Sequence, residues 1–263
     1  MDNNPPIMLS AADFTDTGQW RLIIYISHSG MRAFLIHISD KSRPILRLLA
    51  INWHADDPAS LLSNIETAIY DNPRLLDDYA TDIIIETSQV CFVPNNYLFD
   101  TEDAESEIFT ALFPGEAKEI LADPLSDVTA LYSMTHGLDG FFARTIPGAR
   151  IRSHLAVMIE NFRKSTTADS PAVYADIRNS EVDLILLRGK ELLSASVQRW
   201  HTPEDIAYRI FNMLNAYSIN PEVTKIYLSG LQKPIDYLME TISNYCAQLL
   251  PTPLPANPGG EDP

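Results

Sequence analysis

The order of secondary-structure signals repeats in the two halves of this chain, and the repeat restricts its fold more than any other feature. The first half has three apolar runs separated by short turns, at residues 20–28, 31–38 and 44–53. Three such runs predict an antiparallel meander. An amphipathic helix is expected to follow from Pro58, because Leu61, Ile65 and Ile69 recur with helical spacing.

The second half shows the same order of signals. Its strand-like runs lie at residues 172–177, 182–187, 191–200 and 225–230. The third run ends in Trp-His both times, at Trp53 and Trp200, and a proline opens the next helix, at Pro58 and Pro203. The repeated unit is longer than a solenoid repeat, so the sequence predicts an internal duplication that gives two similar lobes. A chance recurrence of a common meander-and-helix unit is the alternative.

The remaining segments complete the expected order of elements. We expect one buried strand over 82–93 with a bulge at Thr87-Ser88, a strand over 128–134, and helices over 101–113, 149–162 and 234–250. The chain is then divided into an N-terminal arm (1–19), a first lobe (20–165), a second lobe (166–250) and a tail (251–263). The tail is rich in proline and glycine, which predicts disorder.

The charge balance restricts the classes of partner. The chain has 19 Lys and Arg against 35 Asp and Glu, a net charge of −16. Such a field repels phosphate backbones and anionic lipids, so nucleic acid is not expected as a partner. No apolar run is long enough to span a bilayer, and the first residues do not resemble a signal peptide, so we expect a cytoplasmic protein without membrane insertion. Cys91 and Cys246 cannot form a disulfide framework.

Two units of three strands, helix and strand resemble the actin-like ATPase superfamily. Tyr174-Ala175-Asp176, the turn Arg178-Asn179 and the strand 226–230 resemble the phosphate and adenosine regions of the pilus-assembly and cell-division members. The resemblance implies an α/β fold of two lobes, each a βββαβα unit of ribonuclease H-like type. Closer still, the phrases at 90–99, 127–134 and 226–230 resemble a Bacteroidetes family known only as domain of unknown function 3822, which implies no activity.

The resemblance also implies where a nucleotide would bind. Two hairpins that contain glycine would face the phosphates of Mg-ATP, with an aspartate in each. Here Ser27 stands near the first aspartate position and Gly30 lies in that hairpin, whereas Asp176 is followed by Arg178-Asn179 in place of glycine. Gly230 is the remaining glycine of the adenine loop. The four candidate cofactor-binding residues are therefore Asp176, Ser27, Gly30 and Gly230, each of which also suits an ordinary turn.

Other chemistry has little support in the sequence. The six histidines form no metal-ligand spacing, and they lie at His28, His37, His54, His136, His154 and His201. No metal ligands are therefore assigned, and no catalytic residue is assigned.

The leading hypothesis is a non-catalytic scaffold or adaptor that binds an unidentified protein partner and needs no cofactor. The alternative is a divergent nucleotide-binding ATPase or phosphotransferase that uses Mg-ATP in a cleft between the lobes. A sensor of small molecules is a third possibility. The sequence leaves the oligomeric state open.

Overall fold

The chain folds into two compact units built from alternating stretches of sequence. The computed structural model describes residues 16–40, 43–54, 57–98, 104–115, 119–165, 169–246 and 248–252. The first unit comprises Met1–Ile84 and Gly137–Ile151, and the second comprises Ile85–His136 and Arg152–Pro263. The lobe limits expected from the sequence, 20–165 and 166–250, stay a prediction.

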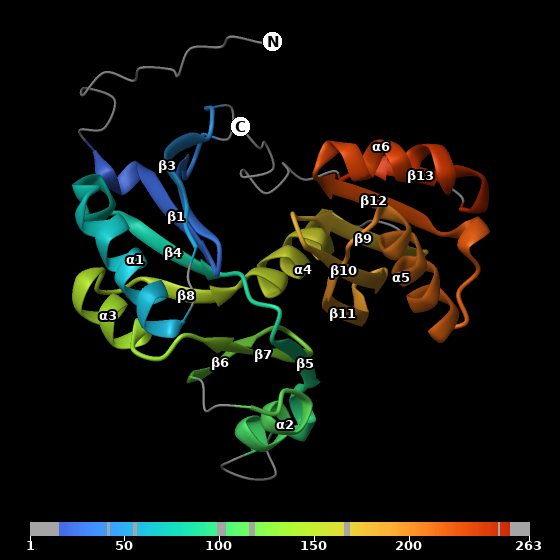
Figure 1. The fold of residues 1–263 in the computed structure, drawn as a ribbon, viewed down its shortest axis with the longest axis horizontal. Coiled ribbons are helices and arrows are strands. Elements are labelled where there is room, and N and C mark those ends of the chain that lie inside the picture. The colour runs from blue at the N-terminus through green and yellow to red at the C-terminus, as the bar shows by residue number, and fades with distance from the viewer. Residues whose placement is uncertain are drawn as a thin grey trace. The chain divides into compact units, whose positions relative to one another are not determined.

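The first unit is a five-stranded sheet with two helices (Figure 1). Its strands, in spatial order, are β3 (Leu46–Asn52), β2 (Gly30–His37), β1 (Trp20–Ser27), β4 (Ala80–Ile85) and β8 (Arg150–Ser153). Helices α1 (Pro58–Tyr70) and α3 (Leu138–Thr145) contact each other through the Tyr70 and Phe141 rings. Helix α1 begins where the sequence predicts, because Asp57 accepts from the Ser60 amide at 2.8 Å and Pro58 opens the first turn.

The second unit contains a sheet with the same strand pattern. Its strands, in order, are β11 (Glu191–Arg199), β10 (Glu181–Arg188), β9 (Pro171–Ile177), β12 (Lys225–Gly230) and β13 (Gln248–Pro251). Helices α5 (Pro203–Ala216) and α6 (Gln232–Thr241) share one apolar core with β9, β10 and β12. On the opposite face, helix α4 (His154–Ser165) packs through Phe162, whose ring stacks on Tyr174, and Tyr174 stacks on Tyr227.

A smaller layer also belongs to the second unit. It is an antiparallel sheet in the order β5 (Val90–Pro94), β7 (Val128–Met134) and β6 (Glu119–Pro124), with helix α2 (Ala104–Leu112) beside it. Phe109 of α2 packs on Val93 and Leu131 of the sheet. The side chains of β7 are buried along its whole length, as expected for a central strand.

The two five-stranded sheets repeat one another in detail. In each, three antiparallel strands are followed by a helix and then by a strand that lies beside the first. Trp53 and Trp200 occupy the same place after the third strand. The Trp53 amide donates to the Ser29 carbonyl at 2.9 Å, and the Trp200 amide donates to the Ser180 carbonyl at 3.1 Å. The repeated order of elements is therefore present, whereas its origin in a duplication stays a prediction.

Three segments differ from the sequence-based expectation. The stretch expected as one bulged strand is two strands in different sheets, β4 and β5. The helix expected over 149–162 begins only at His154, because the four preceding residues pair as the edge strand β8. The helix expected over 234–250 ends at Thr241. The last residues of the expected range belong to strand β13, which pairs with β12.

Two other elements and the chain ends complete this comparison. Strand β6 and helix α3 are additions that the sequence analysis did not predict. Pro251 lies in β13, and residues 253–263 of the expected disordered tail lie outside the described residues. Within the expected arm, residues 1–15 also lie outside them, and residues 17–19 form a 3-10 turn.

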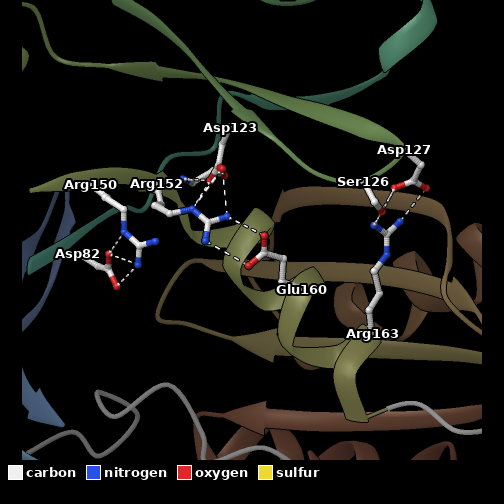
Figure 2. A network of polar contacts seen from close by, with 9 residues as sticks. Asp82, Asp123, Ser126, Asp127, Arg150, Arg152, Glu160 and Arg163 are labelled. Carbon is white, nitrogen blue, oxygen red and sulfur yellow. Dashed lines mark hydrogen bonds and ion pairs between the residues drawn. The ribbon is translucent and has the colours of Figure 1, made fainter. Parts of the chain in front are cut away.

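Arginines tie α4 to the small sheet of the second unit (Figure 2). Arg152, just before α4, forms an ion pair with Asp123 of β6 at 3.0 Å and with Glu160 of α4 at 3.1 Å. Arg163 near the other end of α4 forms an ion pair with Asp127 at 2.7 Å. The Asp123 side chain is 7% exposed and that of Asp127 is 47% exposed, so the two pairs differ mainly in burial.

This difference generates a prediction. We expect Arg152→Ala to lower the free energy of unfolding by about 3–5 kcal/mol, because it leaves the buried Asp123 charge without its guanidinium. Arg163→Ala should cost about 0–1 kcal/mol, because water can solvate Asp127. Urea unfolding followed by circular dichroism measures both. Equal losses in the two variants would show that burial does not set the strength of these pairs.

Candidate functional site

Asp176, one of the two candidate nucleotide residues of the second unit, lies on the face of the sheet that α4 covers. Side chains alternate along β9, so that Ala175 and Ile177 enter the core with α5 and α6, whereas Asp176 points to the opposite face. Asp176 is 4% exposed. The Ser229 hydroxyl, opposite it on β12, donates to its carboxylate at 2.6 Å. Asp176 therefore has a fixed partner, Ser229, within its own sheet.

A second carboxylate, Asp183, lies directly across from Asp176 on β10. Asp183 is 1% exposed and accepts from the Arg178 guanidinium at 2.6 Å. The His154 Nε2 atom at the start of α4 lies 3.3 Å from it, and His154 Nδ1 lies 3.1 Å from the Ile85 carbonyl oxygen. Both of these neighbours are acceptors, so a neutral His154 ring can donate to only one of them.

These contacts push the two aspartate pKa values in opposite directions. Burial raises the pKa of Asp176 to about 6, and the charges of Asp183 and Glu86 add to this effect while Ser229 and Arg178 oppose it. Burial alone would also raise the pKa of Asp183. His154 and Arg178 outweigh burial there and hold the pKa of Asp183 below its usual value. Asp176 therefore takes up a proton at a higher pH than Asp183 does.

Arg178 is the positive centre of this cluster. Burial alone would lower the pKa of its guanidinium, but the charges of Asp183 and Glu86 outweigh burial and raise it. Arg178 also lies 3.4 Å from Glu181 across the β9–β10 turn. The turn itself is held by the Arg178 amide, which donates to the Glu181 carbonyl at 2.8 Å, and by the Trp200 indole, which donates to the Arg178 carbonyl at 2.9 Å.

Gly230 follows Ser229 at the end of β12, where only glycine fits. Its φ of +100° is unfavourable for other residues, and a Cβ there would lie 2.0 Å from the Ile177 carbonyl oxygen. The same carbonyl accepts from the Leu231 amide at 2.9 Å. Close packing of β12 on β9 therefore explains this glycine without a ligand.

Ser27 and Gly30 lie in the β1–β2 turn of the first unit. The Ser27 hydroxyl accepts from the Ser29 amide and donates to the Gly30 carbonyl, both at 3.2 Å. A Cβ on Gly30 would lie 2.5 Å from the Ile51 carbonyl oxygen, so the neighbouring strand β3 requires glycine there. Both residues thus have a structural role in a tight hairpin.

Of the four predicted residues, the structure brings Asp176 and Gly230 to neighbouring strands of one sheet. The sequence analysis did not single out Asp183, Glu86 or His154 as members of a cluster. A signal for Asp183 was available, because a charge between Val182 and Leu184 in a buried strand needs a partner. No sequence spacing would have placed His154 beside it.

In the ranges that the structure describes, no cluster of three or more His, Cys, Asp or Glu residues could hold a metal ion. Burial raises the pKa of the Cys91 thiol to about 11, which keeps it protonated and unreactive at neutral pH. None of the described helices combines the length and the apolar character needed to cross a membrane.

The two glycine environments generate a prediction. Gly148 has a φ of +82° and open space around its Cβ position, so it is a matched control for Gly230. We expect Gly148→Ala to cost about 1–2 kcal/mol for the left-handed backbone alone. Gly230→Ala should lower the free energy of unfolding clearly more, because the new methyl group meets Ile177. Urea unfolding measures both, and equal losses would contradict the close approach of β12 to β9.

The raised pKa of Asp176 predicts a pH dependence with a definite sign. The unfolded chain has an aspartate pKa of about 4, so the folded state binds this proton more tightly. Its contribution to stability is complete below about pH 4 and is lost as the pH rises through about 6. Asp183 acts in the opposite direction, at pH values below the unfolded pKa, because its pKa is lowered.

We therefore expect wild-type stability, relative to Asp176→Asn, to fall between pH 4 and 6. Asparagine keeps the acceptor for Ser229 but does not titrate. Denaturant unfolding at a series of pH values measures the difference, with Asp169→Asn at an exposed position as the control. A difference that does not change with pH would show that Asp176 titrates normally.

Comparisons with known proteins agree with this architecture. The structure of a Bacteroides thetaiotaomicron VPI-5482 protein with actin-like ATPase fold and unknown function matches with a TM-score of 0.78 and 20% identity, over 95% of each chain. A chain of the PilM-PilN type IV pilus biogenesis complex matches with a TM-score of 0.51 and 15% identity, over 90% of this chain and 89% of that one. The expected actin-like α/β fold is thus confirmed.

The search of curated proteins found no match. The model of the family described as protein of unknown function (DUF3822) matches residues 10–249, which is nearly the whole chain. The chain therefore belongs to the DUF3822 family.

Proposed function

We propose that this chain is a cytoplasmic, non-catalytic scaffold or adaptor of actin-like fold that binds a protein partner. The observation that carries the proposal is the position of Arg178 in the second hairpin. A glycine would let the backbone approach a phosphate there. Arg178 instead places a half-buried guanidinium 2.6 Å from the Asp183 carboxylate.

The same contacts argue against a magnesium ion in this cluster. A Mg²⁺ ion needs carboxylate oxygens that are free to coordinate it. Here Asp183 is held by Arg178 and His154, and Asp176 accepts from Ser229. A guanidinium beside the site also repels a divalent cation. The donor set of this hairpin therefore does not suit Mg-ATP.

The backbone of the hairpin supports the same proposal. Phosphate binding requires amide groups that point toward the ligand. The Arg178 amide donates to Glu181 within the turn, and the Trp200 indole bonds the carbonyls of Arg178 and Glu181. The turn is thus stabilised by its own contacts and by a side chain from the end of β11.

The structural neighbours suggest why such a fold would be kept without this site. One matching chain comes from the solved structure of the PilM-PilN type IV pilus biogenesis complex, so that protein was studied bound to another protein. By analogy of fold alone, a protein partner is the natural ligand for this chain.

The first experiment asks whether Mg-ATP binds. We expect no heat of binding by titration calorimetry and no rise in melting temperature with millimolar Mg-ATP. A ligand present at a hundred times its dissociation constant would add about 2.7 kcal/mol to the folded state. Stabilisation in the wild type that is lost in a folded Asp176→Asn variant would overturn the proposal and favour the nucleotide-dependent alternative.

The second experiment asks whether a partner exists. The tagged chain is isolated from native lysate at low salt, and proteins that co-elute in a fixed ratio are expressed and recombined with it. We expect a complex that forms from the two purified chains and is indifferent to Mg-ATP. Failure of every recovered protein to re-form a complex would contradict the adaptor role.

A further inference from the structure

His154, the first residue of α4, is buried between two oxygen acceptors of the second unit. Its side chain is 3% exposed. The Nδ1 atom lies 3.1 Å from the Ile85 carbonyl oxygen, and the Nε2 atom lies 3.3 Å from the Asp183 carboxylate. A carbonyl group and an ionised carboxylate are acceptors only. Both contacts are therefore hydrogen bonds at the same time only when both ring nitrogens carry a proton.

A second buried histidine, His37 of β2, shows the opposite arrangement. His37 is 6% exposed. Its Nδ1 atom accepts from the Asp40 amide at 3.0 Å, and its Nε2 atom lies 3.3 Å from the Oε1 atom of Gln19. Because the Asp40 amide is a donor, a neutral ring with its proton on Nε2 satisfies both contacts. Two histidines of similar burial thus require different proton counts, and His37 is an internal control for His154.

Charged groups from several elements surround the start of α4. Those of β9, β10, their turn and the segment after β4 form one electrostatic cluster, and they are Asp176, Asp183, Arg178, Glu181 and Glu86. Strand β11, which also contacts α4, carries its charged residues Glu191 and Arg199 at its exposed ends. Arg152, two residues before His154, is held by the two ion pairs described above. Asp183 is the member of the cluster in direct contact with the ring.

The Asp183 carboxylate decides which ring nitrogen keeps its proton when one is lost. The pKa of Asp183 is held below its usual value, so this carboxylate is ionised at neutral pH. A charged acceptor forms a stronger hydrogen bond than a neutral carbonyl does. The proton on Nε2 therefore stays, and the proton on Nδ1 leaves. A bare Nδ1 atom then faces the Ile85 carbonyl oxygen with lone pair against lone pair, so this contact can no longer hold.

We propose that His154 is a proton-dependent clamp on the start of α4. With two ring protons, it joins this helix end both to Asp183 of β10 and to Ile85 at the end of β4. With one ring proton, it keeps Asp183 and releases Ile85. A rise in pH thus removes one of the two hydrogen bonds of this side chain and leaves the other in place. All three residues belong to the second unit, and the clamp does not depend on the proposed adaptor function.

The test observes the ring nitrogens directly. The full chain is labelled with nitrogen-15 in its histidine rings, and nuclear magnetic resonance spectra are recorded from about pH 5 to about pH 8. We expect His154 to show two protonated ring nitrogens at the acidic end and to lose the Nδ1 proton as the pH rises. At neutral pH His37 should show a proton on Nε2 alone. The variants His154→Gln and His37→Gln assign the signals.

Two results of this titration would overturn the clamp. One is an unchanged number of protons on the His154 ring over the whole pH range. The other is a neutral ring that keeps its proton on Nδ1, because that ring would release Asp183 instead of Ile85.

The release must also appear in the backbone. The Glu86 amide shares a peptide group with the Ile85 carbonyl, so its signal reports the hydrogen bond to this oxygen. We expect the Glu86 amide signal to shift over the same pH interval as the His154 ring. The shift should disappear in His154→Gln, whose side-chain amide does not titrate, and should persist in His37→Gln. A shift that is the same in both variants contradicts the proposal.

Asp176 provides a second variant that leaves the clamp itself intact. It lies opposite Asp183 in the sheet, and burial raises its pKa to about 6, so it gains a negative charge near the clamp as the pH rises. A nearby negative charge favours a protonated ring. We therefore expect His154 to lose its proton at a lower pH in Asp176→Asn, and at the wild-type pH in the exposed control Asp169→Asn. Identical titrations of His154 in these two variants would overturn its coupling to the cluster.

Discussion

The second unit depends on how it accommodates one buried carboxylate, Asp183. A buried charge is tolerated only when its surroundings supply compensating donors or charges. Here the donors come from Arg178 in the β9–β10 turn and from His154 at the start of α4. His154 also approaches the Ile85 carbonyl at the end of β4, so the histidine that compensates Asp183 contacts this residue as well.

Much of the fold could be predicted from the sequence because strand and helix periods are strong signals over long stretches. The repeated Trp-His ends of the third strands were informative, since Trp53 and Trp200 bond equivalent turns. Short segments were the weak point. Arg150–Ser153 and Gln248–Pro251 are each four residues long, and such stretches fit a helix or a strand equally well until a neighbouring strand pairs with them.

The candidate site could be predicted only in part for a different reason. Asp176 and Gly230 follow from the positions of strand ends, which sequence patterns locate well. The partners of Asp176 depend on tertiary contacts, and the serine that bonds it is 53 residues away. The shared ion pair of Arg21 and Arg150 with Asp82 likewise depends on strand order, because the three residues are far apart in the sequence.

The Arg178–Asp183 pair also limits how this hairpin can change during evolution. Replacing Arg178 by glycine in one step would leave Asp183 buried with His154 as its remaining partner, at a cost of about 3–5 kcal/mol. Domains are stable by only about 5–15 kcal/mol, so that step would endanger the fold. A path from the present arrangement to a glycine hairpin would therefore begin at Asp183 rather than at Arg178.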